Sequence, residues 1–186
     1  SPATWASINA GLPLTNNVVE ITDIAINPSN SLDVAVSLSG FSDGNKVFIS
    51  DDAGTSWTNI SGSLPNIPMN CIEWAPGSND GLYLGGDVGI YYRDNDLGDW
   101  VPYRNGLPHV PVYDLEIHES SNLLRAGTHG RGVWESILYD DCPAAWLLTD
   151  GNLPGSGSQG YRYYQASNTI TSTRSIDGGV GTNVTY

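Results

Sequence analysis

A tryptophan followed at a fixed distance by Leu-Pro occurs three times in this chain, and this repeat constrains the fold more than any other feature. The three copies align without gaps as WASINAGLP at 5–13, WTNISGSLP at 57–65 and WVPYRNGLP at 100–108. Their tryptophans are 52 and 43 residues apart. A period of about 40–50 residues is the length of one propeller blade, a unit that buries its faces on its neighbours. The spacing therefore predicts a repeat protein.

Segments with the period of β-strands follow each Leu-Pro. The first of them alternate apolar and other residues and predict one buried face each, formed by Ile24/Ile26, Ile72/Trp74 and Leu115/Ile117. Two more strand segments complete each unit, at 32–38 and 46–50, 81–86 and 89–93, and 122–127 and 132–136. With the Trp segment as fourth strand, we expect an all-β fold of about three four-stranded β-propeller blades that belong to a larger propeller.

The order of these strands leaves incomplete blades at both ends of the repeat. We expect residues 5–13 to be the last strand of one blade, and the third unit to end at 134–138 without its Trp strand. Joining strands from opposite ends of a chain would remove such open edges. Because propellers need about four to eight blades, we expect further blades upstream in a longer polypeptide, the alternative being strand exchange with a neighbouring chain. The first residue, Ser1, and the unfinished pattern at the end also favour a piece of a longer polypeptide.

Composition excludes several classes of function. The chain has 22 Gly and 11 Pro but one Met and two Phe, which favours turns over long helices. Its net charge of −13 repels nucleic acids and anionic lipid surfaces. No apolar run is long enough to span a membrane, and no signal peptide is visible. The two cysteines, Cys71 and Cys142, have no metal-binding spacing, and whether they pair stays open.

The octapeptide SDDAGTSW at 50–57 places a carboxylate, a glycine and an indole directly after a strand segment. In a tight turn Asp52 can accept hydrogen bonds from backbone N–H groups of its own loop, Gly54 can take a positive φ, and Trp57 can anchor the turn on the blade. A catalytic aspartate would need a second acid across a cleft. Nothing near Asp52 in the sequence suggests one, so we interpret the octapeptide as a structural lock.

The spacing Ser50-x-Asp52-x-Gly54-x-x-Trp57 resembles the Asp-box of the BNR-repeat families, which include sialidases, sortilin-like receptors and several endo-glucanases. In those families the box lies on a hairpin between the third and fourth strands of a blade, and its aspartate faces away from the substrate mouth. The resemblance implies a structural role for these four residues.

A degenerate copy of the same motif, RDNDLGDW, occupies 93–100. Its carboxylates, Asp94, Asp96 and Asp99, resemble a fragment of a calcium loop with oxygen ligands, although the glycine and the distal glutamate of such loops are missing. We keep them as candidate Ca²⁺ ligands beside the simpler reading of a solvated acidic turn, and we expect no other cofactor.

After residue 139 the repeat pattern stops. The sequence predicts three regions: a propeller fragment at 1–139, a linker or loop rich in Gly, Ser and Pro at 140–160, and a short β region at 161–186 whose rungs stack. The stretch YYQASNTITS…GTNVTY resembles the β-stack, or coathanger stack, module of type IX secretion cargo in Bacteroidetes. This resemblance implies a secreted or cell-surface protein.

Three classes of function remain. A sialidase needs an arginine cluster, and only six arginines are spread along the chain. A xyloglucanase-like enzyme needs an aromatic cleft, for which the candidates, by alternation mostly core residues, are Trp74, Tyr83, Tyr91, Tyr92 and Tyr103. Because no catalytic constellation is identifiable, we favour a non-catalytic binding, adhesion or structural module, including a fibre component. Its partners would be an extracellular glycan or protein, or copies of itself. A glycoside hydrolase fragment and a sortilin-like peptide-binding propeller are the alternatives.

Overall fold

The computed structural model describes residues 3–14, 19–139, 161–166, 169–174 and 182–185, with side chains up to residue 139. The chain divides into two compact units, 1–139 and 140–186. The described residues form strands, turns and one 3-10 helix (Glu119–Ser121), and none of them is in an α-helix. The fold of this part is all-β, as the sequence predicts.

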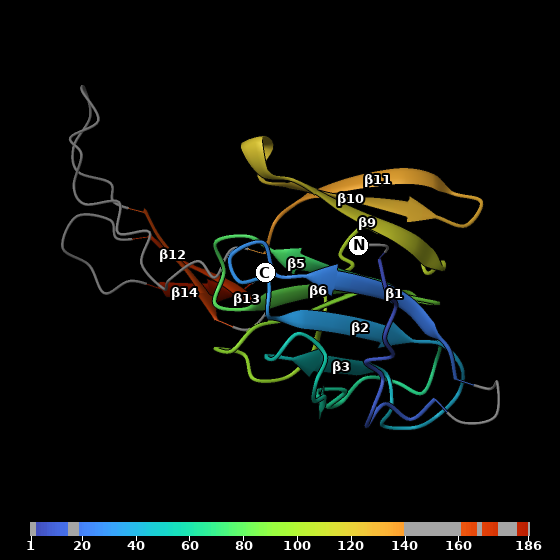
Figure 1. Cartoon of the computed structure of the whole chain (residues 1–186). Coiled ribbons are helices and arrows are strands. Elements are labelled where there is room, and N and C mark those ends of the chain that lie inside the picture. Colours follow the sequence, from blue (N-terminus) through green and yellow to red (C-terminus); the bar gives the residue numbers. More distant parts are fainter. Residues whose placement is uncertain (1–2, 15–18, 140–160, 167–168, 175–181, 186) are drawn as a thin grey trace. The chain divides into compact units, whose positions relative to one another are not determined.

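The first unit consists of three antiparallel sheets, which are the propeller blades (Figure 1). The first blade has the order β1-β2-β3-β4, with β1 (Ile21–Ile26), β2 (Val34–Leu38), β3 (Val47–Ser50) and β4 (Thr58–Asn59). The second has the order β5-β6-β7-β8, with β5 (Met69–Ala75), β6 (Gly81–Gly86), β7 (Gly89–Arg93) and β8 (Val101–Pro102). The third is three-stranded, with β9 (Val112–His118), β10 (Leu123–Thr128) and β11 (Gly132–Ile137). The second blade contacts both others, mainly through β5, which packs on β1, β2 and β9.

The first and second blades share a continuous apolar core. Ile72 and Trp74 of β5 are buried there, as the alternation predicts, and pack with Ala25, Ala35 and Val47 of the first blade. The Trp74 indole Nε1 also donates a hydrogen bond to the Ala25 carbonyl at 3.2 Å. The first strand of one blade is therefore the element that seals it against the preceding blade.

The second and third blades repeat this arrangement. Leu115 of β9 is buried against a core that includes Tyr83 and Tyr92, and Ile117 packs at its margin. Gly85 of β6 lies against the Cys71 side chain and Val112, so a larger residue would collide with them. Cys71 is a free, buried thiol in this core, and its burial raises the pKa of the thiol. Cys142 lies outside the described residues.

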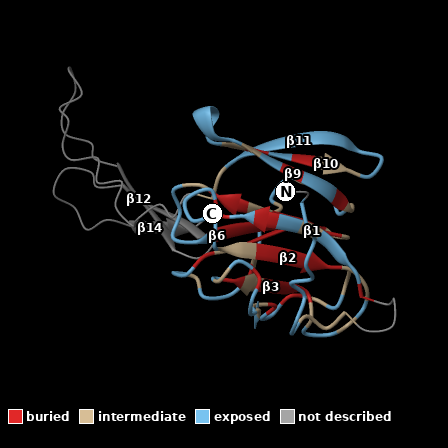
Figure 2. Cartoon of the chain, in the orientation of Figure 1, coloured by how far each residue is buried: buried red, intermediate tan, exposed pale blue. Residues whose placement is uncertain are grey.

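The first strand of the first blade departs from the prediction. Ile24 and Ile26, expected to be buried, are 59% and 58% exposed, because the described residues place no preceding blade against them (Figure 2). Residues 5–13, expected to form a strand, form none, and Trp5 is 99% exposed. Leu12 and Leu14 in this region instead cover the buried core residues Val36, Leu38 and Phe48.

The second unit contains a small antiparallel sheet. It has the order β12-β13-β14, with β12 (Tyr161–Ala166), β13 (Thr169–Arg174) and β14 (Thr182–Thr185). Strands adjacent in the chain are therefore hydrogen-bonded neighbours. The predicted linker, 140–160, lies outside the described residues.

Candidate functional site

The 50–57 turn joins β3 to β4 and is held by hydrogen bonds within itself. The Ser50 hydroxyl oxygen accepts hydrogen bonds from the backbone N–H of Gly54 at 2.8 Å and of Asp52 at 3.2 Å. Gly54 has a φ of 86°, the left-handed conformation that glycine adopts at little cost. Ser50 is thus the centre of a tight loop at the end of a buried strand.

The Asp52 carboxylate is directed to the same loop. Its Oδ1 accepts hydrogen bonds from the Ser56 backbone N–H at 2.8 Å and from the Ser50 hydroxyl at 2.7 Å, and its Oδ2 accepts one from the Ser56 hydroxyl at 2.7 Å. These donors, the Ser56 N–H first, lower the pKa of Asp52 to about 2. Such a carboxylate stays ionised near neutral pH and cannot serve as a general acid there.

The tryptophan that ends each turn connects two repeats. The Trp57 Nε1 donates to the Ile8 carbonyl at 2.8 Å, and the Trp100 Nε1 donates to the Ile60 carbonyl at 2.7 Å. Ile8 and Ile60 each stand three residues after the Trp of the preceding copy, so the two bonds are equivalent. We call this bond the indole clamp. The indole clamp could have been predicted from the gapless alignment of the copies, because both the donor and the acceptor recur at fixed positions.

The 93–100 turn joins β7 to β8 and uses Asp94 as its centre. The buried Asp94 accepts hydrogen bonds at Oδ1 from the backbone N–H of Leu97 at 2.7 Å and of Asp96 at 3.0 Å. Its Oδ2 accepts one from the Tyr92 hydroxyl at 3.1 Å. The Asp94 carboxylate thus has the role in this turn that the Ser50 hydroxyl has in the 50–57 turn, since each accepts two backbone N–H bonds.

The other two predicted calcium ligands, Asp96 and Asp99, each accept hydrogen bonds from different residues. Asp96 Oδ1 accepts a hydrogen bond from the Asn79 amide at 3.0 Å. Asp99 Oδ1 accepts bonds from the N–H of Ser63 at 3.1 Å and of Trp100 at 2.8 Å, and these donors lower the pKa of Asp99. Within the described residues, no group of three or more His, Cys, Asp or Glu side chains could hold a metal ion. The Ca²⁺ hypothesis stays a prediction.

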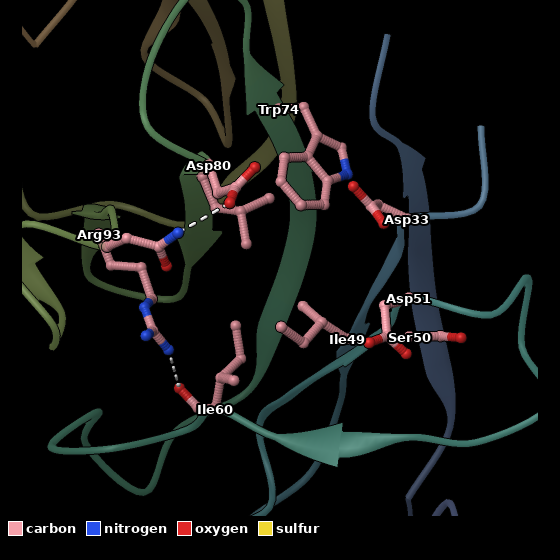
Figure 3. Close-up of a pocket in the computed structure, with 10 residues that line it drawn as sticks. Asp33, Ile49, Ser50, Asp51, Ile60, Trp74, Asp80 and Arg93 are labelled. Atoms are coloured by element: carbon pink, nitrogen blue, oxygen red, sulfur yellow. Dashed lines mark hydrogen bonds between the residues drawn. The ribbon is translucent and has the colours of Figure 1, made fainter. Parts of the chain in front are cut away.

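A pocket of about 140 Å³ lies between the first and second blades, beside the 50–57 turn (Figure 3). Figure 3 shows Asp33 and Asp51 on one side of it and Asp80 and Arg93 on the opposite side. The residues that line it are Asp33, Ile49, Ser50, Asp51, Ile60, Trp74, Asp80, Leu82, Arg93 and Asn95. Sequence reasoning missed this pocket, because its walls come from strand ends and loops of two different repeats.

The polar groups of the pocket differ in how far they are already paired. Asp33 accepts hydrogen bonds from the amides of Asn27 at 3.2 Å and Asn30 at 3.0 Å, and Asp80 accepts one from the Asn95 amide at 2.7 Å. The exposed Asp51 carboxylate makes no hydrogen bond within the described part of the chain. Arg93, whose guanidinium is the one cationic group of the lining, donates from Nη1 to the Ile60 carbonyl at 3.4 Å.

A carboxyl group with a raised pKa lies elsewhere, on β5. The pKa of the half-buried Glu73 is raised to about 7, first by desolvation and then by the negative charges of Glu116, Asp23 and Asp114. Because Glu73 alternates with Ile72 and Trp74, it lies on the face of β5 toward the third blade. It does not line the pocket.

The aromatic residues considered for a cleft belong to the core. Tyr83 and Tyr92 are fully buried, and Trp74 and Tyr91 are nearly so. The Tyr83 ring contacts Tyr92 and Tyr103 at centroid distances of 4.9 and 5.5 Å. These side chains stabilise blade packing and do not form an open aromatic surface.

Comparisons with known proteins were made on the whole chain. No family model and no curated protein matches it. Among solved structures, it is similar to the GH74 enzyme of Niastella koreensis, with a TM-score of 0.49 and 16% identity over 89% of this chain. It is also similar to the GH74 xyloglucanase of Xanthomonas campestris, with a TM-score of 0.45 and 15% identity over 84% of this chain. The chain spans 28% of the length of each.

No helix among the described residues is long and apolar enough to cross a membrane.

Proposed function

We propose that the chain is a non-catalytic, extracellular propeller module that binds a ligand or serves as a scaffold, and that its 50–57 turn is an Asp-box. The observation that carries this proposal is the state of Asp52. Both of its carboxylate oxygens accept hydrogen bonds inside the turn, and its pKa is about 2. The Asp52 carboxylate of the 50–57 octapeptide thus stabilises the hairpin between β3 and β4.

The extracellular location rests on the sequence of the second unit. The resemblance of this unit to the β-stack of type IX secretion cargo supports export and display at a cell surface. The net charge of −13 supports a soluble surface exposed to water and fits neither a nucleic acid nor an anionic lipid as partner. An extracellular glycan or protein, or a further copy of the chain, is the partner that remains.

A second function, part of a glycoside hydrolase, has one observation in its favour. The half-buried Glu73 has a pKa that is raised to about 7, first by desolvation and then by the charges of Glu116 and two aspartates, and a carboxyl group protonated near neutral pH is what a general acid needs. Glycosidases use one such carboxylic acid together with a second carboxylate that acts as nucleophile or base. Glu73 does not line the described pocket, so we favour binding over hydrolysis.

The test compares hydrolysis with binding for the same purified chain. We expect no release of reducing ends from xyloglucan, and retarded migration in gels that contain a polysaccharide ligand. Release of reducing ends that the Glu73→Gln variant abolishes would establish the hydrolase instead. Hydrolysis that survives this variant would also contradict the proposal and would place the catalytic acid elsewhere.

A further inference from the structure

We propose that two copies of this chain associate head to tail, with residues 5–13 of one copy forming a fourth strand on β11 of the other. This inference rests on the scaffold role in the proposed function and names a further copy of the chain as the partner. It follows from the repeat. Backbone and indole groups that are paired between repeats within one copy recur without partners on the first and third blades, in matching positions.

The fourth strand of a blade is attached to the third strand by a bond at a fixed place in the repeat. In the first blade, the Ile60 N–H donates to the Val47 carbonyl at 3.0 Å. In the second blade, the Tyr103 N–H donates to the Ile90 carbonyl at 2.8 Å. Each donor stands three residues after the Trp of its copy, and each acceptor is the second residue of its aligned strand segment. The bond is therefore a rule of the repeat.

The remaining donor and acceptor of this rule are unpaired in a single copy. Ile8 stands three residues after Trp5, and its N–H makes no hydrogen bond within the described residues. Val133 has the acceptor's position on β11, the outer strand of the third blade (Figure 1). Leu138 donates to the Asn122 carbonyl, and bonded and non-bonded pairs alternate along antiparallel strands, so the Val133 carbonyl points away from β10.

The indole clamp is incomplete at the same two ends. Within one copy, the Trp57 and Trp100 indoles each donate to the carbonyl three residues after the preceding Trp. By this rule, the Trp5 indole of a second copy donates to the Tyr103 carbonyl. Trp5 is 99% exposed, and neither its indole nor that carbonyl makes a hydrogen bond in the described part of one copy. Two donors of residues 5–13 thus find both acceptors in one register.

The faces that this pairing brings together are apolar and exposed in a single copy. Ile24 and Ile26 on β1 are 59% and 58% exposed, whereas the equivalent residues of β5 are buried against the preceding blade. Val133 and Ile137 on β11 are 75% and 69% exposed. Figure 2 shows β11 exposed along its length. A third blade packed before β1 buries both faces, as the first blade buries that of β5.

A second copy is the partner that these positions select. Within one copy, the bond from Trp57 holds Ile8 on the first blade, whereas β11 belongs to the third, and the second blade contacts both. A head-to-tail interface joins different surfaces of its two partners, so it closes into a ring or extends into a filament. Two copies supply six blades, which lies within the range of about four to eight in closed propellers. We therefore expect a dimer.

The charge of the chain makes this association dependent on salt. Each copy has a net charge of −13, so two copies repel each other. The proposed contacts are hydrogen bonds and apolar side chains, which salt does not screen. Because salt screens the repulsion, the dimer should be tighter in about 0.5 M than in about 0.05 M NaCl.

Sedimentation equilibrium of the full chain over a range of concentrations measures the association. Trp5→Phe should weaken the dimer at least tenfold through loss of a hydrogen bond. Ile24→Gln should weaken it by a larger factor through loss of apolar burial. Both side chains are exposed in a single copy, so both variants should fold. Phe41→Ala, which removes a 70% exposed ring outside the proposed contacts, is the control and should leave the association unchanged.

A disulfide cross-link tests the register. Ile8 of one copy lies opposite Val133 of the other in the proposed pairing, and opposite residues of antiparallel strands have Cα atoms about 4.5–5.5 Å apart, within disulfide range. Mild oxidation of a mixture of the single variants Ile8→Cys and Val133→Cys should link two copies. A mixture of Ile8→Cys and Phe41→Cys should not, and it also measures any linkage through the two native cysteines.

The outcomes separate this proposal from the function on which it rests. A chain that stays monomeric at every concentration would overturn the proposal, as would a dimer that Trp5→Phe and Ile24→Gln leave unchanged or that shows no Ile8–Val133 link. A filament that both variants disrupt would support the pairing. A monomer leaves the proposed non-catalytic binding function intact, whereas release of reducing ends from xyloglucan by the chain would reject that function.

Discussion

Replacing Trp100 by phenylalanine should destabilise the chain measurably more than the same change at Trp57. Trp100 is 5% exposed, and its Nε1 donates to the Ile60 carbonyl at 2.7 Å. Phenylalanine removes this bond, worth about 1 kcal/mol, and leaves the carbonyl with only the long contact from Arg93. The smaller ring also loses about 1 kcal/mol of packing. We expect the free energy of unfolding to fall by about 2 kcal/mol.

The equivalent change at Trp57 serves as the internal comparison. Its bond to the Ile8 carbonyl has a similar length of 2.8 Å, but its surroundings are exposed. Water can replace a bond at such a site, so we expect a loss of less than about 1 kcal/mol. Urea unfolding followed by circular dichroism measures both, since fluorescence would change with the tryptophans themselves. Equal losses, or a smaller loss at Trp100, would refute the reasoning that burial gives the clamp its strength.

Three further predictions concern charge and backbone. The raised pKa of Glu73 means that the folded chain holds this proton more tightly than the unfolded one, so stability should fall as pH rises from about 4.5 to about 7. Glu73→Gln should remove this fall, so that the free energy of unfolding at pH 8 rises by about 1 kcal/mol, a value reduced for a half-exposed group. The variant should then have a higher Tm than the original chain at pH 8 but not at pH 4. A dependence of Tm on pH that the variant leaves unchanged would argue against this role of Glu73. The lowered pKa of Asp52 acts in the opposite sense, since its contribution to stability exists above about pH 4 and disappears toward pH 2. Asp52→Asn should therefore reduce the fall of Tm between about pH 4 and pH 2. An equal fall of Tm in the variant and the original chain would contradict this. Gly62→Ala should lower the free energy of unfolding in urea by about 1 kcal/mol more than Gly77→Ala. Both glycines have a positive φ, but only at Gly62 would an added Cβ collide with another group, the Asp99 carboxylate. Similar losses for the two variants would show that the Asp99 side chain moves away without a cost.

The strands could be predicted because their information is local. Period-two alternation and the glycines between the segments located all the longer strands of the three blades to within a few residues. Which strand faces are buried was harder to predict from the sequence, since burial depends on what lies against a strand. Ile24 and Ile72 occupy equivalent positions in the repeat, yet only Ile72 is buried, because the first blade covers it. A repeat gives the pattern of a face, and the neighbouring blade decides whether that face is buried.

The candidate site shows the same division. The internal bonds of the 50–57 turn follow from residues within the octapeptide, so a structural role for Asp52 could be argued from the sequence alone. The pocket combines Asp33 and Asp51 of the first repeat with Arg93 of the second. These residues belong to no common motif, and only the packing of two blades brings them together.

The central claim is that the indole clamps of Trp57 and Trp100 hold neighbouring repeats together. Hydrogen–deuterium exchange of the indole N–H groups, followed by NMR, tests it directly. The Trp100 indole, which donates to a carbonyl in half-buried surroundings, should exchange at least tenfold more slowly than the fully exposed Trp5 indole of the monomer, with the Trp57 indole between them. Exchange of Trp100 as fast as that of Trp5 would contradict the claim.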